Sequence, residues 1–174
     1  ALEARTRAVA LAVGVNDAIV RHGEMPRIPV ADMRLVLKNN AKNYLQQDLP
    51  NHVFDCHIIS PRAQAKSVDA PKTAPAPQKQ KVLIAGAKKQ MIDNFQQAAR
   101  NAGWVADHIV PCLVGPLNAV ELAMPEIFAR EVVALVDIGF KSSSICILQQ
   151  GELILSRVVN IGGDRLTTAV AEAI

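Results

Sequence analysis

The last third of the chain constrains the fold most, because it sets an apolar strand, a polar loop and a hairpin in direct succession. The strand ends in the sequence VDIG at residues 136–139, after an apolar run that begins at Val132. Such a run is typical of a strand that is buried on both faces. Two further apolar segments, residues 145–147 and 153–158, lie on either side of residues 149–151, which predicts a hairpin.

The loop between this strand and the hairpin is suited to an anion. It contains Gly139 and the serines at positions 142–144, so backbone amides and hydroxyl groups can point at one phosphate. Asp137 would repel a bare phosphate, but it can hold Mg²⁺ through water, as small hard cations prefer. We therefore predict a Mg-nucleotide site that includes Asp137, with Mg²⁺ held through water, and Gly139, Ser142 and Ser143 facing phosphate.

Gly162 and Gly163 precede a segment with helical apolar spacing. Glycines ahead of a helix let a ligand approach the backbone and the positive end of the helix. We add both glycines to the predicted nucleotide site and expect Asp164 to cap the helix. A tight turn before a capped helix is the alternative interpretation, and the glycines alone do not decide between the two.

The order VDIG, SSS, hairpin and NIGGDRLT resembles the second phosphate-binding segment of the actin-like ATPases, in particular the branch that contains PilM of type IV pilus assembly and the division protein FtsA. Residues 9–59 and 81–122 are similar in order to the PilM segments that precede the second lobe, so the likeness covers nearly the whole chain. The resemblance implies that the first phosphate segment and the adenine-binding segment lie outside this sequence. Phe140 and Lys141 stand where the family usually has small residues and threonines.

The alternation of strands and helices in the second half predicts an α/β fold. The resemblance implies actin-like (ribonuclease H-like) lobes with a small inserted α+β subdomain. Residues 1–17 and 81–130 would belong to the first lobe, residues 18–80 to the inserted subdomain with a flexible linker at 61–80, and residues 131–174 to the start of the second lobe. Because the chain opens with an alanine and ends inside a predicted helix, we expect a fragment of a larger two-lobe protein.

Two longer helices are predicted before the site, in addition to a short one at residues 116–124. In the first, a stripe of residues recurs at three- and four-residue steps and Asp32 is the expected cap. The second helix, around residues 91–102, would end at Gly103. The predicted buried stripe of the first helix consists of Met33, Leu37, Ala41, Tyr44 and Leu45.

Composition limits the function classes. The 19 basic and 16 acidic residues leave a net charge of +3, which is too small to argue for nucleic acid binding. No apolar run approaches the roughly 18 residues of a membrane helix. Cys56, Cys112 and Cys146 fall in apolar surroundings, so we expect three reduced core thiols and a cytoplasmic protein.

The resemblance implies ATP and Mg²⁺ as cofactors and a role as a platform for type IV pilus or related secretion assembly. The implied partners are the N-terminal tail of a PilN-like membrane protein and other pilus platform proteins. The implied location is the cytoplasmic face of the inner membrane, with membrane contact only through partners. The tail would dock in a groove near residues 8–15 and 18–24. Since no residue can be assigned to orient an attacking water, we expect at most a slow ATPase.

Two alternatives stay open at this point. One is a scaffold that has lost the nucleotide, similar to the cytoplasmic domain of type II secretion platform proteins, and Phe140 and Lys141 favour it slightly. The other is an FtsA-like cell-division protein, which would require a membrane-targeting helix beyond the present sequence.

Overall fold

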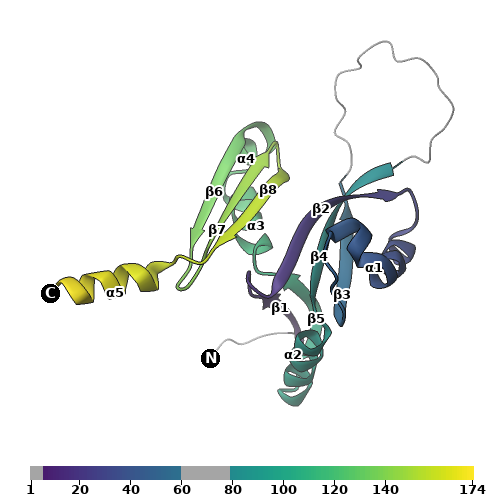
Figure 1. The fold of residues 1–174 in the computed structure, drawn as a ribbon, viewed down its shortest axis with the longest axis horizontal. Coiled ribbons are helices and arrows are strands. Elements are labelled where there is room, and N and C mark those ends of the chain that lie inside the picture. The colour runs from purple at the N-terminus through teal and green to yellow at the C-terminus, as the bar shows by residue number, and fades with distance from the viewer. Residues whose placement is uncertain (1–5, 60–78) are drawn as a thin grey trace, which may run out of the picture. The chain divides into compact units, whose positions relative to one another are not determined.

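The computed structural model describes residues 6–59 and 79–174 and divides the chain into two compact units (Figure 1). Ala1–Ala18 and Phe95–Ile174 form one, here called the terminal unit, and Ile19–Asn94 form the other, the middle unit. The predicted linker at 61–80 lies outside the described residues, except for its last two residues, which begin a strand. The predicted division of the chain into lobes stays a prediction.

The middle unit is a three-stranded sheet with one helix packed against it (Figure 1). The strands follow the order β2-β4-β3, and β3 runs antiparallel to β4 with Cys56 opposite Ile84. The residue ranges are Ala18–Pro26 for β2, Val30–Leu45 for α1, His52–Ile58 for β3 and Lys79–Lys88 for β4.

The helix α1 buries the predicted stripe. Met33, Leu37, Ala41 and Leu45 are buried, and Tyr44 packs beside them partly buried, which confirms the prediction. Full burial of a large apolar side chain stabilises a fold by about 1.5–3 kcal/mol. The sheet contributes side chains with no exposed surface to this core, namely Met25, Val82 and Ile84.

The predicted cap of α1 is wrong. The N-cap residue is Pro29, and Asp32 lies in the first turn, where its backbone N–H donates to the Pro29 carbonyl over 3.0 Å. Proline fixes φ near the value that enters a helix, so the helix begins before the aspartate. The Asp32 carboxylate still interacts favourably with the positive helix end.

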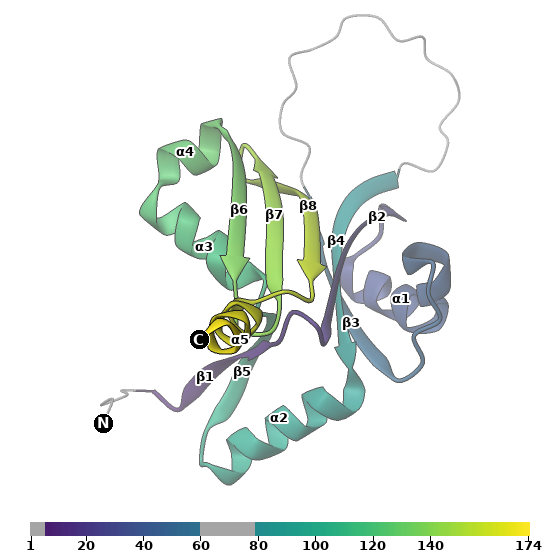
Figure 2. The same cartoon turned by 60° about the vertical axis from the view of Figure 1, so that its left-hand side comes forward.

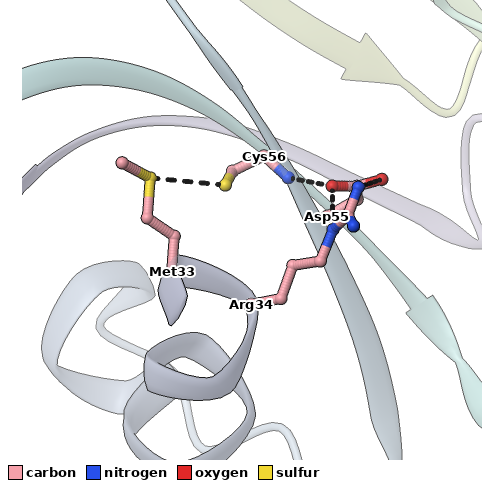
Figure 3. A network of polar contacts seen from close by, with 4 residues as sticks. All are labelled: Met33, Arg34, Asp55 and Cys56. Atoms are coloured by element: carbon pink, nitrogen blue, oxygen red, sulfur yellow. Dashed lines mark hydrogen bonds and ion pairs between the residues drawn. The ribbon is translucent and has the colours of Figure 1, made fainter. Parts of the chain in front are cut away.

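Polar and sulfur contacts join α1 to β3 (Figure 3). Arg34 donates from Nε and Nη2 to the two carboxylate oxygens of Asp55, over 2.8 and 3.0 Å. The Cys56 thiol lies 3.6 Å from the Met33 sulfur, and burial raises the pKa of this thiol. The ion pair is exposed and the sulfur pair is buried, so the sulfur side carries the packing between helix and strand.

The terminal unit contains two sheets (Figures 1 and 2). In one, β1 and β5 pair in parallel, and in the other β6, β7 and β8 form an antiparallel meander. The strand ranges are Ala8–Val13 for β1, Val105–Pro111 for β5, Val132–Ile138 for β6, Ser143–Gln149 for β7 and Glu152–Val159 for β8. The helix ranges are Lys89–Asn101 for α2, which begins in the middle unit, Val114–Ala123 for α3, Pro125–Arg130 for α4 and Gly163–Ala173 for α5.

The helix α2 ends as predicted. Gly103 follows it with φ +77°, and its backbone N–H donates to the Arg100 carbonyl over 3.0 Å. The next amide, that of Trp104, donates to the Ala99 carbonyl over 2.8 Å. These two bonds satisfy carbonyls at the helix end, and glycine adopts the left-handed conformation without a steric penalty.

The sheet β6-β7-β8 is buried on one face only. The helices α3 and α4 contact β6, and α4 also contacts β7. Cys146, Leu148 and Leu153 are buried in this sheet. On the alternate positions of β6, Val132 is 66% exposed and Ile138 is 71% exposed. The prediction that this strand is buried on both faces is therefore wrong for the described residues, because its alternate side chains meet no covering element among them.

The cysteines differ from the prediction at one position. Cys56 and Cys146 are buried thiols, but Cys112 is exposed at the end of β5. The apolar neighbours of Cys112 in the sequence do not bury it, because it lies in the turn between β5 and α3. None of the helices within residues 6–59 and 79–174 has the length and apolar character that a membrane crossing requires.

Candidate functional site

The loop that joins β6 to β7 is a tight connection at the end of the sheet. The antiparallel register places Ile138 opposite Ser143, so only the residues at 139–142 make the turn. The Gly139 N–H donates to the Ser142 carbonyl over 3.1 Å and closes it. Within the described part of the chain, the backbone amides of Phe140, Lys141 and Ser142 donate to no protein acceptor. Successive amides of this kind can form an anion-binding concavity.

The start of α5 is fastened to the same loop. The Gly163 N–H donates to the Gly139 carbonyl and the Asp164 N–H donates to the Phe140 carbonyl, each over 2.9 Å. The three predicted site glycines, Gly139, Gly162 and Gly163, are thus brought together from the two ends of the β7–β8 hairpin. The sequence could not show this meeting, because it depends on how the chain returns after β8.

Gly162 is required here by lack of space. Its φ is −145°, which any residue adopts, but a Cβ at this position would lie 2.5 Å from the Gly139 carbonyl oxygen and closer still to that of Phe140. A side chain would therefore separate α5 from the loop. Gly162 is also the N-cap of α5 and no side-chain bond caps the helix, so the prediction that Asp164 is the cap is wrong. Asp164 lies in the first turn and interacts favourably with the helix dipole.

The two predicted site serines have different surroundings. Ser143 is buried, and its hydroxyl donates its proton to the Ile161 carbonyl over 2.6 Å. Ser142 is half-buried, and its hydroxyl oxygen accepts a hydrogen bond from the Asn16 amide over 3.3 Å. Since a hydroxyl has a single proton, the geometry favours Ser142 over Ser143 as a donor to an anion.

Asp137 is the last residue but one of β6, and its side chain is exposed. It lies opposite Ser144 and on the same face of the sheet as Cys146. Burial, and secondarily the charge of Asp137, raise the pKa of the Cys146 thiol. An exposed carboxylate beside a loop with free amides has the chemistry that a hydrated Mg²⁺ requires. Within residues 6–59 and 79–174, including the surroundings of Asp137, no group of at least three His, Cys, Asp or Glu side chains converges as a metal site.

Phe140 does not belong to a protein core. Its side chain is 67% exposed, while its carbonyl accepts the bond from α5. The backbone of Phe140 is therefore part of the junction between the loop and the helix, and its side chain is not required to hold that junction together.

Asn16 is the site residue that sequence reasoning missed. It lies in the turn after β1, where the Gly14 carbonyl accepts bonds from the amides of Asp17 and Ala18, both over 2.9 Å. The sequence signal was a turn-type cluster, GVND at residues 14–17, between two apolar strands. Nothing in that pattern indicates a contact with a serine 126 positions away.

Comparison with known proteins decides the family. The sequence matches the family described as type IV pilus assembly protein PilM over residues 1–173. The chain belongs to the PilM family. The resemblance noted in the sequence is confirmed by this match. A direct comparison with curated proteins gives no match.

Solved structures confirm the fold. A PilM chain of a PilM-PilN type IV pilus biogenesis complex matches with a TM-score of 0.77 and 23% identity, over 98% of this chain and 48% of that chain. The cytoplasmic domain of EpsL, an inner-membrane component of the type II secretion system of Vibrio cholerae, matches with a TM-score of 0.50 and 11% identity, over 88% of this chain and 50% of that one. The chain thus has the α/β, actin-like fold predicted for a PilM protein and spans about half the length of the PilM chain it matches.

Proposed function

We propose that this chain is part of an ATP-binding platform protein for type IV pilus assembly and that the loop at 139–142 holds the phosphates. One observation carries the proposal. The amides of Gly163 and Asp164 fasten the start of α5 to the β6–β7 loop, and Gly139 and Gly162 leave no room for a Cβ. The loop keeps free amides beside an exposed carboxylate. A glycine-lined loop at a helix N-terminus is the usual protein solution for binding phosphate.

The residues fit Mg-ATP in defined roles. Asp137 would hold Mg²⁺ through water, and the Ser142 hydroxyl and the amides of residues 140–142 would donate to phosphate oxygens. Gly163 would let the nucleotide approach the backbone, whereas Gly162 would act by letting α5 lie against the carbonyls of Gly139 and Phe140. The predicted roles of Gly139 and Ser143 are then mainly to shape the loop, since their donors are engaged with protein acceptors. The bound metal would neutralise phosphate charge.

Hydrolysis is expected to be slow at most. Phosphoryl transfer to water requires a polar residue that orients the water in line with the terminal phosphate. No described residue of the loop can be assigned that task, so we propose a nucleotide-controlled switch and not a metabolic enzyme.

The proposed partner is the cytoplasmic N-terminal tail of a PilN-like membrane protein. The support is the match of 98% of this chain to a PilM chain in a complex with PilN. We place the protein at the inner face of the inner membrane, where it would contact the membrane only through such partners. Titration of the full-length protein with a peptide of that tail tests this part, and no saturable binding would contradict it.

Calorimetric titration of the full-length protein with Mg-ATP tests the nucleotide site. We expect saturable binding that is lost, or weakened more than about tenfold, in Asp137→Ala, because the metal then has no protein carboxylate in the site. Asp48→Ala is the matched control, since Asp48 is also an exposed aspartate and lies outside the terminal unit. Equal binding by the wild type and Asp137→Ala would remove Asp137 from the site.

A second candidate function is a scaffold that does not bind nucleotide. Two observations favour it. The backbone N–H groups of Gly139, Gly163 and Asp164 already donate to protein carbonyls and so are not free for a phosphate. The fold also matches that of the EpsL domain. If the bulk of Phe140 has caused such a loss, Phe140→Ser restores or strengthens Mg-ATP binding. Unchanged binding in that variant would exclude crowding as the cause.

A further inference from the structure

Asn16 and Ser142 form a contact that the proposed site does not yet use. The Asn16 side-chain amide donates to the Ser142 hydroxyl oxygen over 3.3 Å. Both residues belong to the terminal unit, although they are 126 positions apart. The bond therefore links the turn after β1 to the loop that we propose for the phosphates.

The direction of this hydrogen bond determines what Ser142 can do. A serine hydroxyl has one proton to donate and two lone pairs that accept. Because the Asn16 amide occupies a lone pair, the proton of Ser142 stays available for another acceptor. In the neighbouring Ser143 the proton is already donated to the Ile161 carbonyl. Of the two site hydroxyls, Ser142 alone is thus left as a donor for an anion.

An asparagine suits this position better than an aspartate. A carboxylate only accepts hydrogen bonds, so it would take the Ser142 proton for itself. It would also add a second negative charge near the phosphates, besides that of Asp137, and like charges repel. The amide does neither, since it is neutral and donates.

We infer that Asn16 is a positioning residue of the nucleotide site and that it holds the Ser142 hydroxyl as a donor toward phosphate. The inference rests on the proposed function of the loop at 139–142. Asn16 acts through Ser142 and requires no contact of its own with the nucleotide. Its effect on binding must therefore depend on the presence of the Ser142 hydroxyl.

A double-mutant cycle on the full-length protein tests this dependence, with Mg-ATP affinity measured by calorimetry. We expect Asn16→Ala to weaken binding about threefold to tenfold, the range of one hydrogen bond. In the Ser142→Ala background the same change is expected to have no effect, because there is no hydroxyl to orient. Asn94→Ala is the matched control, since Asn94 also makes a side-chain hydrogen bond on an exposed surface, in this case as the acceptor from Gln90 over 3.0 Å.

Asn16→Asp sharpens the test. It is expected to weaken binding more than Asn16→Ala, whereas Asn94→Asp, which adds the same charge on α2, leaves the affinity unchanged. Thermal midpoints of all variants show that each is folded. An Asn16→Ala effect that is absent, or equal with and without the Ser142 hydroxyl, overturns the inference while the nucleotide site stands. Absence of Mg-ATP binding by the wild type overturns the proposed function and this inference with it.

Discussion

The two three-stranded sheets of this chain differ in how their apolar side chains are covered. In β2-β4-β3, the helix α1 covers the core and Met33, Leu37 and Ile84 have no exposed surface. In β6-β7-β8, one face is buried while Val136 of the edge strand stays 54% exposed. The candidate phosphate loop lies at the end of the second sheet. Burial of large apolar side chains therefore marks where stability is concentrated, and free amides and an exposed carboxylate mark where a ligand can bind.

The largest effect on stability is expected in the sheet β2-β4-β3, which α1 covers. Leu37→Ala should lower the free energy of unfolding by about 2–5 kcal/mol, because it removes a fully buried side chain and leaves a cavity. Val136→Ala is the comparison on the exposed face and should lower it by less than about 1 kcal/mol. Urea unfolding of this chain measures both changes. Equal losses would contradict the difference between the sheets.

The second largest effect is expected at the junction between the loop at 139–142 and α5. Gly162→Ala should destabilise the terminal unit by about 1–3 kcal/mol and weaken Mg-ATP binding, because the new Cβ separates α5 from the loop. Gly115→Ala in α3 is the matched control, since a Cβ there meets nothing within 4 Å. It should be neutral or slightly stabilising, because alanine favours a helix over glycine. Thermal unfolding and calorimetry compare the two variants, and a harmless Gly162→Ala would argue against a close junction.

The buried thiols of Cys56 and Cys146 are expected to have a smaller effect on stability, and this effect depends on pH. Burial raises the pKa of Cys56 and Cys146 above the ordinary value of 9.0. The folded state then holds these protons more tightly than the unfolded state, so this contribution to stability is complete below that value and declines as the pH rises above it. Iodoacetamide should modify Cys112 first at pH 8, and Cys146 only at higher pH or on unfolding. Mass spectrometry of the labelled peptides checks the order, which labelling of Cys146 ahead of Cys112 would refute.

The smallest expected effect is at the surface of α1. The Arg34–Asp55 ion pair has two good hydrogen bonds, but both side chains are more than half exposed. Asp55→Asn should therefore change the unfolding midpoint only slightly, and the change should shrink further at high salt. A loss comparable to that of Leu37→Ala would show that the pair, and not the core, holds the helix to the sheet.

Much of the fold could be predicted from the sequence because local signals are strong there. The apolar stripe of α1, the glycine after α2 and the hairpin after Ser143 all follow from periodicity and turn chemistry. The residue that caps α1 could not be predicted, because the nearby Pro29 begins the helix in place of Asp32. The burial of β6 could not be predicted either, since an apolar run is typical of a strand covered on both faces but does not show which element covers each face.

The site was predictable in part. Asp137 and the glycines stand out because they end a strand or precede a helix, but the structure is needed to show that Gly162 meets the Gly139 carbonyl. Ser142 and Ser143 differ in whether the hydroxyl proton is free to donate. This difference depends on contacts with Asn16 and Ile161, which are distant in the chain. Tertiary contacts of this kind leave no trace in local sequence patterns.

Hydrogen–deuterium exchange of the full-length protein, with and without saturating Mg-ATP, tests the central claim most directly. The amides of residues 140–142 have no protein acceptor in the described chain, so they should exchange fast without nucleotide and more slowly when phosphate oxygens accept from them. The amides of α1 should not change and serve as the internal reference. Bound nucleotide with unchanged exchange at residues 140–142 would contradict the assignment of this loop as the phosphate site.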